Sequence, residues 1–119
     1  MSIIEDVDVV VQEQADVALP GYTQEQVEAW KAQYGQVYVS EFGEGEVFVW
    51  RCITRAEYRK IMSMQRLDMW QREEEICKIC VLDPEGYNYA TAKAGIATIL
   101  AEQILNKSGF IVDSLPQEL

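Results

Sequence analysis

Two cysteines with two residues between them, Cys77 and Cys80, are the first candidates for chemistry in this chain. A redox-active pair with this spacing has its first thiol at a helix N-terminus, where the helix dipole lowers the thiol pKa. Three glutamates and an isoleucine precede Cys77, which predicts that the pair lies inside a helix. A zinc site needs four ligands, but the sequence adds only Cys52 and has no histidine. Because sulfurs three positions apart share one helix face, we expect both thiols in the core.

The acidic residues show no pattern that favours acid–base or metal chemistry. The chain has no histidine, the commonest general base, and no carboxylate stands alone in an apolar run as a tuned catalytic acid does. Asp68, between Leu67 and Met69, comes nearest, but its position predicts a helix N-cap. Residues 83–86 lack the regular spacing of a calcium loop. We therefore expect no catalytic residue, no cofactor and no metal, and a protein that is not an enzyme.

The chain has 119 residues, of which 49% are apolar, and a net charge of −10. This length predicts one domain, and this composition supports a folded core. So acidic a chain disfavours binding to nucleic acid, whose phosphates need basic contacts. No uncharged run approaches the roughly 20 residues of a membrane helix, and the acidic start has no signal-peptide pattern. We expect no membrane partner and a cytosolic protein with three reduced thiols.

The charges are unevenly distributed along the sequence. Residues 1–50 carry ten acids and one base, whereas residues 51–72 carry two acids and six bases, a local charge of +4. A basic segment between acidic flanks can be a solvated helix face, or it can offer a docking stripe to a partner or to further copies of the chain. Arg55 and Arg59 lie on the predicted outer face of a helix in this segment. Both belong to the predicted partner-binding residues.

Periodicity and turn residues divide the chain into an arm, a domain and a tail. Residues 1–20, rich in valine and acids and closed by a Pro-Gly turn, predict an acidic arm or an edge strand. Residues 21–110 are expected to form a single globular domain, and residues 111–119 a C-terminal tail. The domain begins with a capping box at Thr23 and a helix over about 24–34.

A β-hairpin is predicted next in the chain. Two alternating runs, 36–42 and 46–53, are joined by three residues, two of them glycines. The three tryptophans, Trp30, Trp50 and Trp70, fall at positions predicted to face inward. Trp50 is the exception, because a hairpin with one open face would expose it to a partner.

Helical patterns fill the rest of the domain. A helix is predicted over about 55–66, and residues 67–82 continue helically, either as part of it or as a second helix. The last helix, about 89–107, is apolar nearly all round, so it should be central or covered by another chain. The inner face of the 55–66 helix is expected to carry Tyr58, Ile61, Met62 and Gln65. These elements predict an α+β fold in which a β-hairpin, extended if the arm supplies an edge strand, is packed by three or four helices.

Two stretches of sequence resemble small proteins of tailed bacteriophages, most nearly the tail assembly chaperones: VWRCITRAEY at 49–58 and EEICKICVLDP at 74–84. The resemblance spans about residues 46–110 and brings no catalytic residue with it. It implies a non-catalytic morphogenesis protein that associates with the tape measure protein while the tail tube forms. A structural subunit retained in the virion, in the tail, baseplate or neck, is the alternative.

A chaperone of this kind implies a groove that holds an amphipathic helix of its client. We expect that groove between the helices of 55–82 and 89–107. The partner would be the tape measure or another tail protein, met in the host cytoplasm, or in the virion for a structural subunit. Assembly with copies of the chain through the hairpin edge stays open. The predicted partner-binding residues are Trp50, Arg55, Arg59, Ile96, Leu100 and Ile104.

Overall fold

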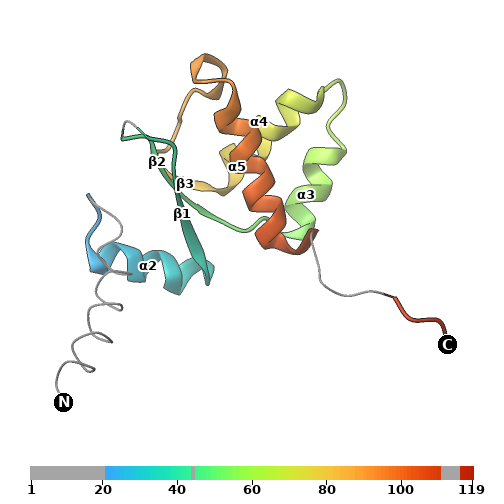
Figure 1. The fold of residues 1–119 in the computed structure, drawn as a ribbon, viewed down its shortest axis with the longest axis horizontal. Helices are drawn as coiled ribbons and strands as arrows, with labels where there is room; N and C mark the ends of the chain where they lie inside the picture. Colours follow the sequence, from blue (N-terminus) through green and yellow to red (C-terminus); the bar gives the residue numbers. More distant parts are fainter. Residues whose placement is uncertain (1–20, 44, 111–115) are drawn as a thin grey trace. The chain divides into compact units, whose positions relative to one another are not determined.

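In the computed structural model, the described residues are 21–43, 45–110 and 116–119. The structure divides into two units after Gly35, and each is described by itself (Figure 1). This division leaves open the prediction that residues 21–110 form a single domain. The arm or edge strand predicted for residues 1–20 lies outside the described residues.

Helix α2, Gln24–Tyr34, belongs to the first unit and has the predicted bounds. Thr23 is its N-cap, with a hydroxyl that accepts a hydrogen bond from the backbone N–H three residues later at 3.0 Å. The helix ends at Gly35, where a φ of 83° suits a residue without a side chain. Tyr22 packs edge-on against Trp30, with ring centroids 5.4 Å apart. Trp30, which was predicted to face inward, is half-buried.

The second unit opens with the predicted hairpin and adds a third strand. The sheet is antiparallel, with the order β1-β2-β3: β1 is Val37–Glu41, β2 is Val47–Arg51 and β3 is Val81–Asp83. Tyr38 lies opposite Trp50, so their side chains share one face of the sheet, as the alternation predicts. Ser40 lies opposite Phe48 on the same face.

Strand β3 corrects the prediction that residues 67–82 are helical throughout. The backbone turns extended at Val81, with φ −76° and ψ 121°, and this residue lies opposite Trp50 of β2. Pro84 favours an extended backbone at Asp83, and hydrogen bonds to β2 replace those that the helix would have supplied. A valine shortly before an Asp-Pro pair suits a short strand at least as well as a helix end.

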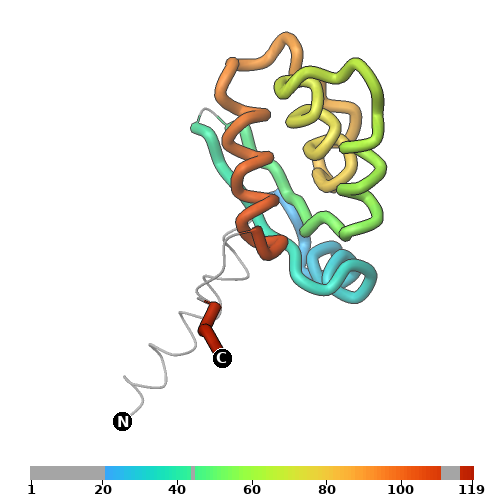
Figure 2. Tube along the Cα trace, turned by 90° about the vertical axis from the view of Figure 1, so that its right-hand side faces the viewer, coloured from blue at the N-terminus to red at the C-terminus, as the bar shows by residue number. Residues whose placement is uncertain are grey.

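The segment that follows the hairpin holds two helices, α3 and α4, rather than one. They are α3, Arg55–Met62, and α4, Met69–Cys80. Each begins with a capping box, at Thr54 and at Asp68, and the predicted N-cap role of Asp68 is confirmed. Between them Arg66 has a φ of 67°, which an α-helix cannot accommodate. The two helices lie side by side (Figure 2).

Helix α3 ends earlier than predicted, and part of its predicted inner face is wrong. Ile61 is fully buried and Tyr58 is half-buried, as predicted, but Met62 and Gln65 are exposed. Gln65 lies in the loop after the helix, so the helical spacing no longer applies to it. Trp70 was also predicted to face inward and is 65% exposed, because it lies in the first turn of α4, ahead of the buried part of that helix.

Helix α5, Gly95–Leu105, is shorter than the predicted 89–107. A 3₁₀ turn, η1 at Tyr89–Thr91, precedes it, and a wide π-type turn, η2 at Asn106–Phe110, follows it. One side of α5 is buried, but Ile99 on its other side is 44% exposed. The helix is therefore central without being covered all round. In the view of Figure 1 it lies between the strands and α3.

One hydrophobic core joins the sheet to α3, α4 and α5, which confirms the predicted α+β fold. Cys77 and Cys80 are fully buried within it, also as predicted. Its buried members come from every one of these elements and from segments next to them: Phe48, Trp50, Ile53, Ile61, Ile76, Cys77, Cys80, Val81, Tyr89, Ile96, Ala97, Leu100, Ala101 and Ile104.

Candidate partner-binding surface

Four of the six predicted partner-binding residues belong to the core. Their side chains are at most 3% exposed: Trp50, Ile96, Leu100 and Ile104. The predicted groove is not open at these positions, because their side chains pack in the core that joins α5 to the sheet, α3 and α4. An apolar helix face signals burial, but it does not say whether the cover comes from the same chain or from a partner.

Trp50 lies in a cluster of aromatic and polar side chains on the hairpin face. Its indole N–H donates to the Ser40 hydroxyl at 2.8 Å, and its ring stacks on Tyr38 with centroids 4.7 Å apart. The Ser40 hydroxyl donates in turn to Gln103 of α5, and the Lys107 ammonium lies 5.7 Å from the centre of the Tyr38 ring. The polar groups of this cluster bond to one another, as in a structural network. A hollow of about 260 Å³ lies beside them, lined by Tyr38, Val39, Ser40, Trp50, Gln103, Asn106 and Lys107.

The other two predicted residues, Arg55 and Arg59, are exposed on α3, as expected. Lys60 is exposed beside them, and we call these three residues the basic face. Positions four apart lie one helical turn from each other, so Arg55 and Arg59 project from the same side of α3. The ion pairs Arg51–Glu57 and Lys78–Glu75 involve none of the three. A shallow hollow of about 310 Å³ lies among Ala56, Arg59, Lys60 and Ser63.

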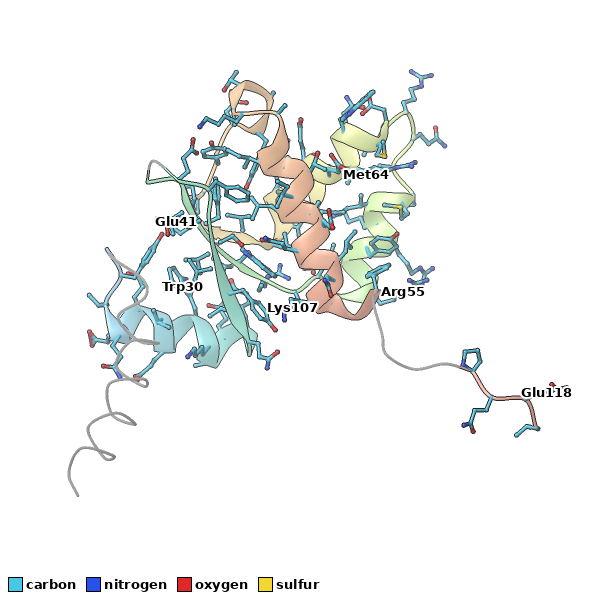
Figure 3. The ribbon with its side chains drawn as sticks, in the orientation of Figure 1. Trp30, Glu41, Arg55, Met64, Lys107 and Glu118 are labelled. Carbon is cyan, nitrogen blue, oxygen red and sulfur yellow. The ribbon has the colours of Figure 1, made fainter. Side chains whose placement is uncertain are left out.

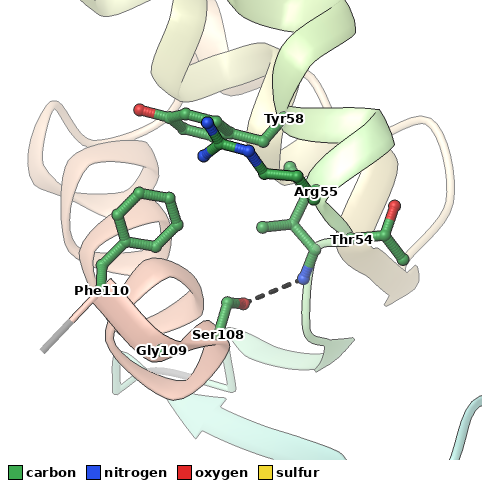
Figure 4. A pocket seen from close by; sticks show the side chains of 7 residues that line it. Thr54, Arg55, Tyr58, Ser108, Gly109 and Phe110 are labelled. Atoms are coloured by element: carbon green, nitrogen blue, oxygen red, sulfur yellow. Dashed lines mark hydrogen bonds between the residues drawn. The ribbon is translucent and has the colours of Figure 1, made fainter. Parts of the chain in front are cut away.

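Another hollow, of about 230 Å³, lies where α3 begins (Figure 4). The rings of Tyr58 and Phe110 meet there with centroids 4.8 Å apart, and the Arg55 guanidinium carbon is 5.7 Å from the centre of the Tyr58 ring. Figure 3 shows Arg55 at this end of α3, beside the turn that follows α5. We call this site the aromatic hollow; it is lined by Ile53, Thr54, Arg55, Tyr58, Ser108, Gly109 and Phe110.

The turn η2 builds one wall of the aromatic hollow. Ser108 accepts a hydrogen bond from the backbone N–H of Ile53 at 3.0 Å and donates to the carbonyl of Ile104. Gly109 has φ 98° and ψ 11°, a left-handed conformation that reverses the chain and returns Phe110 to Tyr58. Sequence reasoning missed this hollow, because its two rings come from distant segments. The glycine before Phe110 was the local signal for a chain reversal.

An arginine–glutamate pair fixes the orientation of α3. Arg51 donates to both carboxylate oxygens of Glu57, at 2.9 and 3.0 Å, and to the backbone carbonyls of Cys52 and Ile79 at 3.0 and 3.1 Å. The pKa of Glu57 is lowered to about 2, mainly by the hydrogen bonds from Arg51. A hydrogen bond from the Thr54 backbone lowers it further. The end of β2, the start of α3 and the end of α4 are thus held at one point.

The buried thiols have no reactive setting. Burial is the main cause that raises the pKa of Cys77 and of Cys80 to about 12, and neighbouring glutamates add to the effect at Cys77. The Cys77 thiol also lies 3.5 Å from the carbonyl oxygen of Ala97. A thiol with so high a pKa is not a nucleophile near neutral pH. The predicted core role of this pair is confirmed.

The described residues include no group of three or more histidine, cysteine, aspartate or glutamate side chains that could hold a metal ion. None of the helices described is both long and apolar enough to cross a membrane. No match to the chain was found among protein-family models, curated proteins or solved structures.

Proposed function

We propose that this protein is a non-catalytic binding protein that docks an acidic helical segment of a protein partner on the basic face. One observation carries the proposal. Arg55, Arg59 and Lys60 are all exposed on the eight-residue helix α3, in a chain whose net charge is −10. Such a patch attracts an acidic segment, while the acidic remainder of the chain repels wrong orientations of it.

The support beneath the basic face suits it to recognition. Arg51 and Glu57 fix the first turn of α3, and Ile61 anchors the other end of the helix in the core. Surface charges on a rigid helix lose less freedom when a partner binds than charges on a loop do. An amphipathic helix of the partner could then lie along α3 with its acidic side toward Arg55 and Arg59.

In its specific form, the proposal is a bacteriophage tail assembly chaperone whose partner is the tape measure protein. The resemblance over about residues 46–110 supports this form, and it includes Arg55 in the run 49–58. The buried, unreactive state of Cys77 and Cys80 agrees with a role that needs no redox chemistry. Such a chaperone would act in the host cytoplasm.

The test is binding of purified tape-measure segments to the full chain and to two charge variants. In the first, Arg55→Glu and Arg59→Glu reverse the basic face. In the control, Lys31→Glu and Lys78→Glu make the same change in net charge on α2 and α4. We expect the first variant to bind at least about tenfold more weakly than the control. Equal binding by both variants, or no binding of any segment to the wild type, would refute the proposal.

A second candidate, a structural subunit retained in the virion, draws on the sheet. Within the described residues β1 is an outer strand of the order β1-β2-β3, and Val39 at its centre is 40% exposed. An outer strand can pair with a strand of the next copy and extend the sheet through an assembly. Mass spectrometry of fractionated infected lysates separates the candidates. A fixed stoichiometric amount in finished particles favours the subunit, and a soluble complex with the tape measure protein favours the chaperone.

A further inference from the structure

We infer that the aromatic hollow is an anchor site for one large apolar side chain of the acidic partner segment that the basic face binds. The inference rests on the proposed function and makes it more specific. It gives the partner a two-part signature, a carboxylate for Arg55 and a neighbouring apolar side chain for the rings of Tyr58 and Phe110.

The apolar walls of the hollow suit such a side chain. Tyr58 and Phe110 supply two rings with centroids 4.8 Å apart, and Ile53 is 7% exposed beneath them. Phe110 itself is 47% exposed, so a ligand can still cover much of its ring. The volume of about 230 Å³ is below the roughly 300–1,000 Å³ of typical small-molecule pockets. A single side chain of a protein partner fits this size better than a cofactor does.

The polar groups at the hollow limit what else it can recognise. The Ser108 hydroxyl already bonds to the backbone at Ile53 and Ile104, and the Thr54 hydroxyl accepts from the backbone N–H of Glu57. The charged group in the lining is therefore Arg55, which is a cation. An apolar residue flanked by carboxylates matches this combination of rings and positive charge.

Continuity with the basic face identifies the occupant. Arg55 belongs both to the lining of the hollow and to the basic face, and Arg59 lies one turn further along α3. An acidic amphipathic helix along α3 would place its carboxylates on these two arginines and one apolar side chain at the hollow. A small number of buried aromatic contacts commonly supplies most of the energy of such an interface.

Peptide binding to the full-length protein tests the anchor. The probes are two acetylated heptapeptides, one with a phenylalanine between two runs of three glutamates and one with an alanine in its place. Titrations are followed by the backbone amide signals of the protein. We expect the phenylalanine peptide to bind about tenfold more tightly, from burial of its ring, and to shift the signals of Ser108 and Gly109. Phe110→Ala should remove this preference, and Ile99→Ala, which trims an equally exposed side chain on α5, should keep it.

Other outcomes would overturn the anchor. Equal affinity for the two peptides, or a preference that survives Phe110→Ala, would exclude the hollow as its source. Shifts of the Ser108 and Gly109 signals with protein concentration alone would assign the hollow to a second copy of the chain. If both peptides bind equally and Arg59→Gln weakens both, the basic face keeps its proposed function without an anchor. If neither peptide binds, the anchor and the proposed docking of acidic segments fail together.

Discussion

The guanidinium of Arg51 meets the carboxylate of Glu57 in two parallel hydrogen bonds of 2.9 and 3.0 Å. Paired N–H groups and paired oxygens make this a strong, charge-assisted contact with a defined geometry. The same carboxylate accepts from the Thr54 backbone N–H, and the same guanidinium donates to the Ile79 carbonyl. The orientation of the basic face therefore depends on this half-buried contact in the first turn of α3.

Replacing Glu57 should weaken the fold in a pH-dependent way. At pH 7 we expect Glu57→Gln to lower the free energy of unfolding by about 1–2 kcal/mol, since 31% of the Glu57 side chain is exposed and water screens the pair. Folding lowers the pKa of Glu57 from 4.5 to about 2, so its stabilisation is complete above pH 4.5 and is lost as the pH falls toward 2. Urea unfolding followed by circular dichroism between pH 7 and pH 2.5 measures this.

The matched control is Glu85→Gln, which removes one exposed carboxylate in the second unit. Its free energy of unfolding should stay within about 0.5 kcal/mol of the wild type at pH 7. A deficit for Glu57→Gln that is as large at pH 2.5 as at pH 7 would show that the ionised carboxylate is not what stabilises this contact.

The tryptophans should differ sharply in their effect on stability. Trp50 is 3% exposed and its indole N–H donates to Ser40, whereas Trp70 is 65% exposed. We expect Trp50→Ala to cost about 3–5 kcal/mol and Trp70→Ala less than about 0.5 kcal/mol. Thermal unfolding of the two variants measures the contrast. A similar loss in both would mean that Trp70 is covered in solution, for instance by a second copy.

Local rules predicted the elements whose signals lie within a few residues of each other. Thr54 and Asp68 begin α3 and α4 as N-caps, and the alternation around Trp50 gave the correct faces of the hairpin. The strand at Val81 was missed, because three residues form a strand only when a distant partner such as β2 accepts them. Its pairing energy is a property of the tertiary fold.

Only the part of the candidate site that depends on local sequence was predicted. Arg55 and Arg59 are charged and lie on the outer face of a capped helix, so their exposure follows from their own segment. Leu100 lies on an apolar helix face that α4 covers. The sequence of its own segment does not show whether the same chain or a partner covers such a face. The pairing of Tyr58 with Phe110 depends on where α5 ends relative to α3, which is again a long-range property.

Leu100 should therefore behave as a core residue and not as a partner contact. It is fully buried, so Leu100→Ala should lower the free energy of unfolding by about 2–5 kcal/mol. The control is Ile99→Ala, at a position 44% exposed on the same helix, which should cost less than about 1 kcal/mol. Below the unfolding temperature of both variants, affinity for a tape-measure segment should equal that of the wild type. A stable Leu100→Ala protein that has lost binding would restore the groove that the sequence suggested.

The buried thiols should make the protein sensitive to alkali but resistant to alkylation. Burial raises the pKa of Cys77 and Cys80 from 9.0 to about 12, so the folded protein keeps both thiols protonated where the unfolded chain ionises them. Stability is therefore complete below pH 9 and falls as the pH rises toward 12, as both thiols ionise. Iodoacetamide at pH 8 should leave both thiols unmodified until urea unfolds the chain.

Cys77→Ala should reduce the alkaline loss of stability by about the contribution of one thiol. Cys52→Ala, at a partly exposed position, serves as the control for loss of a cysteine. Rapid alkylation of Cys77 in the folded protein would contradict its place in the core.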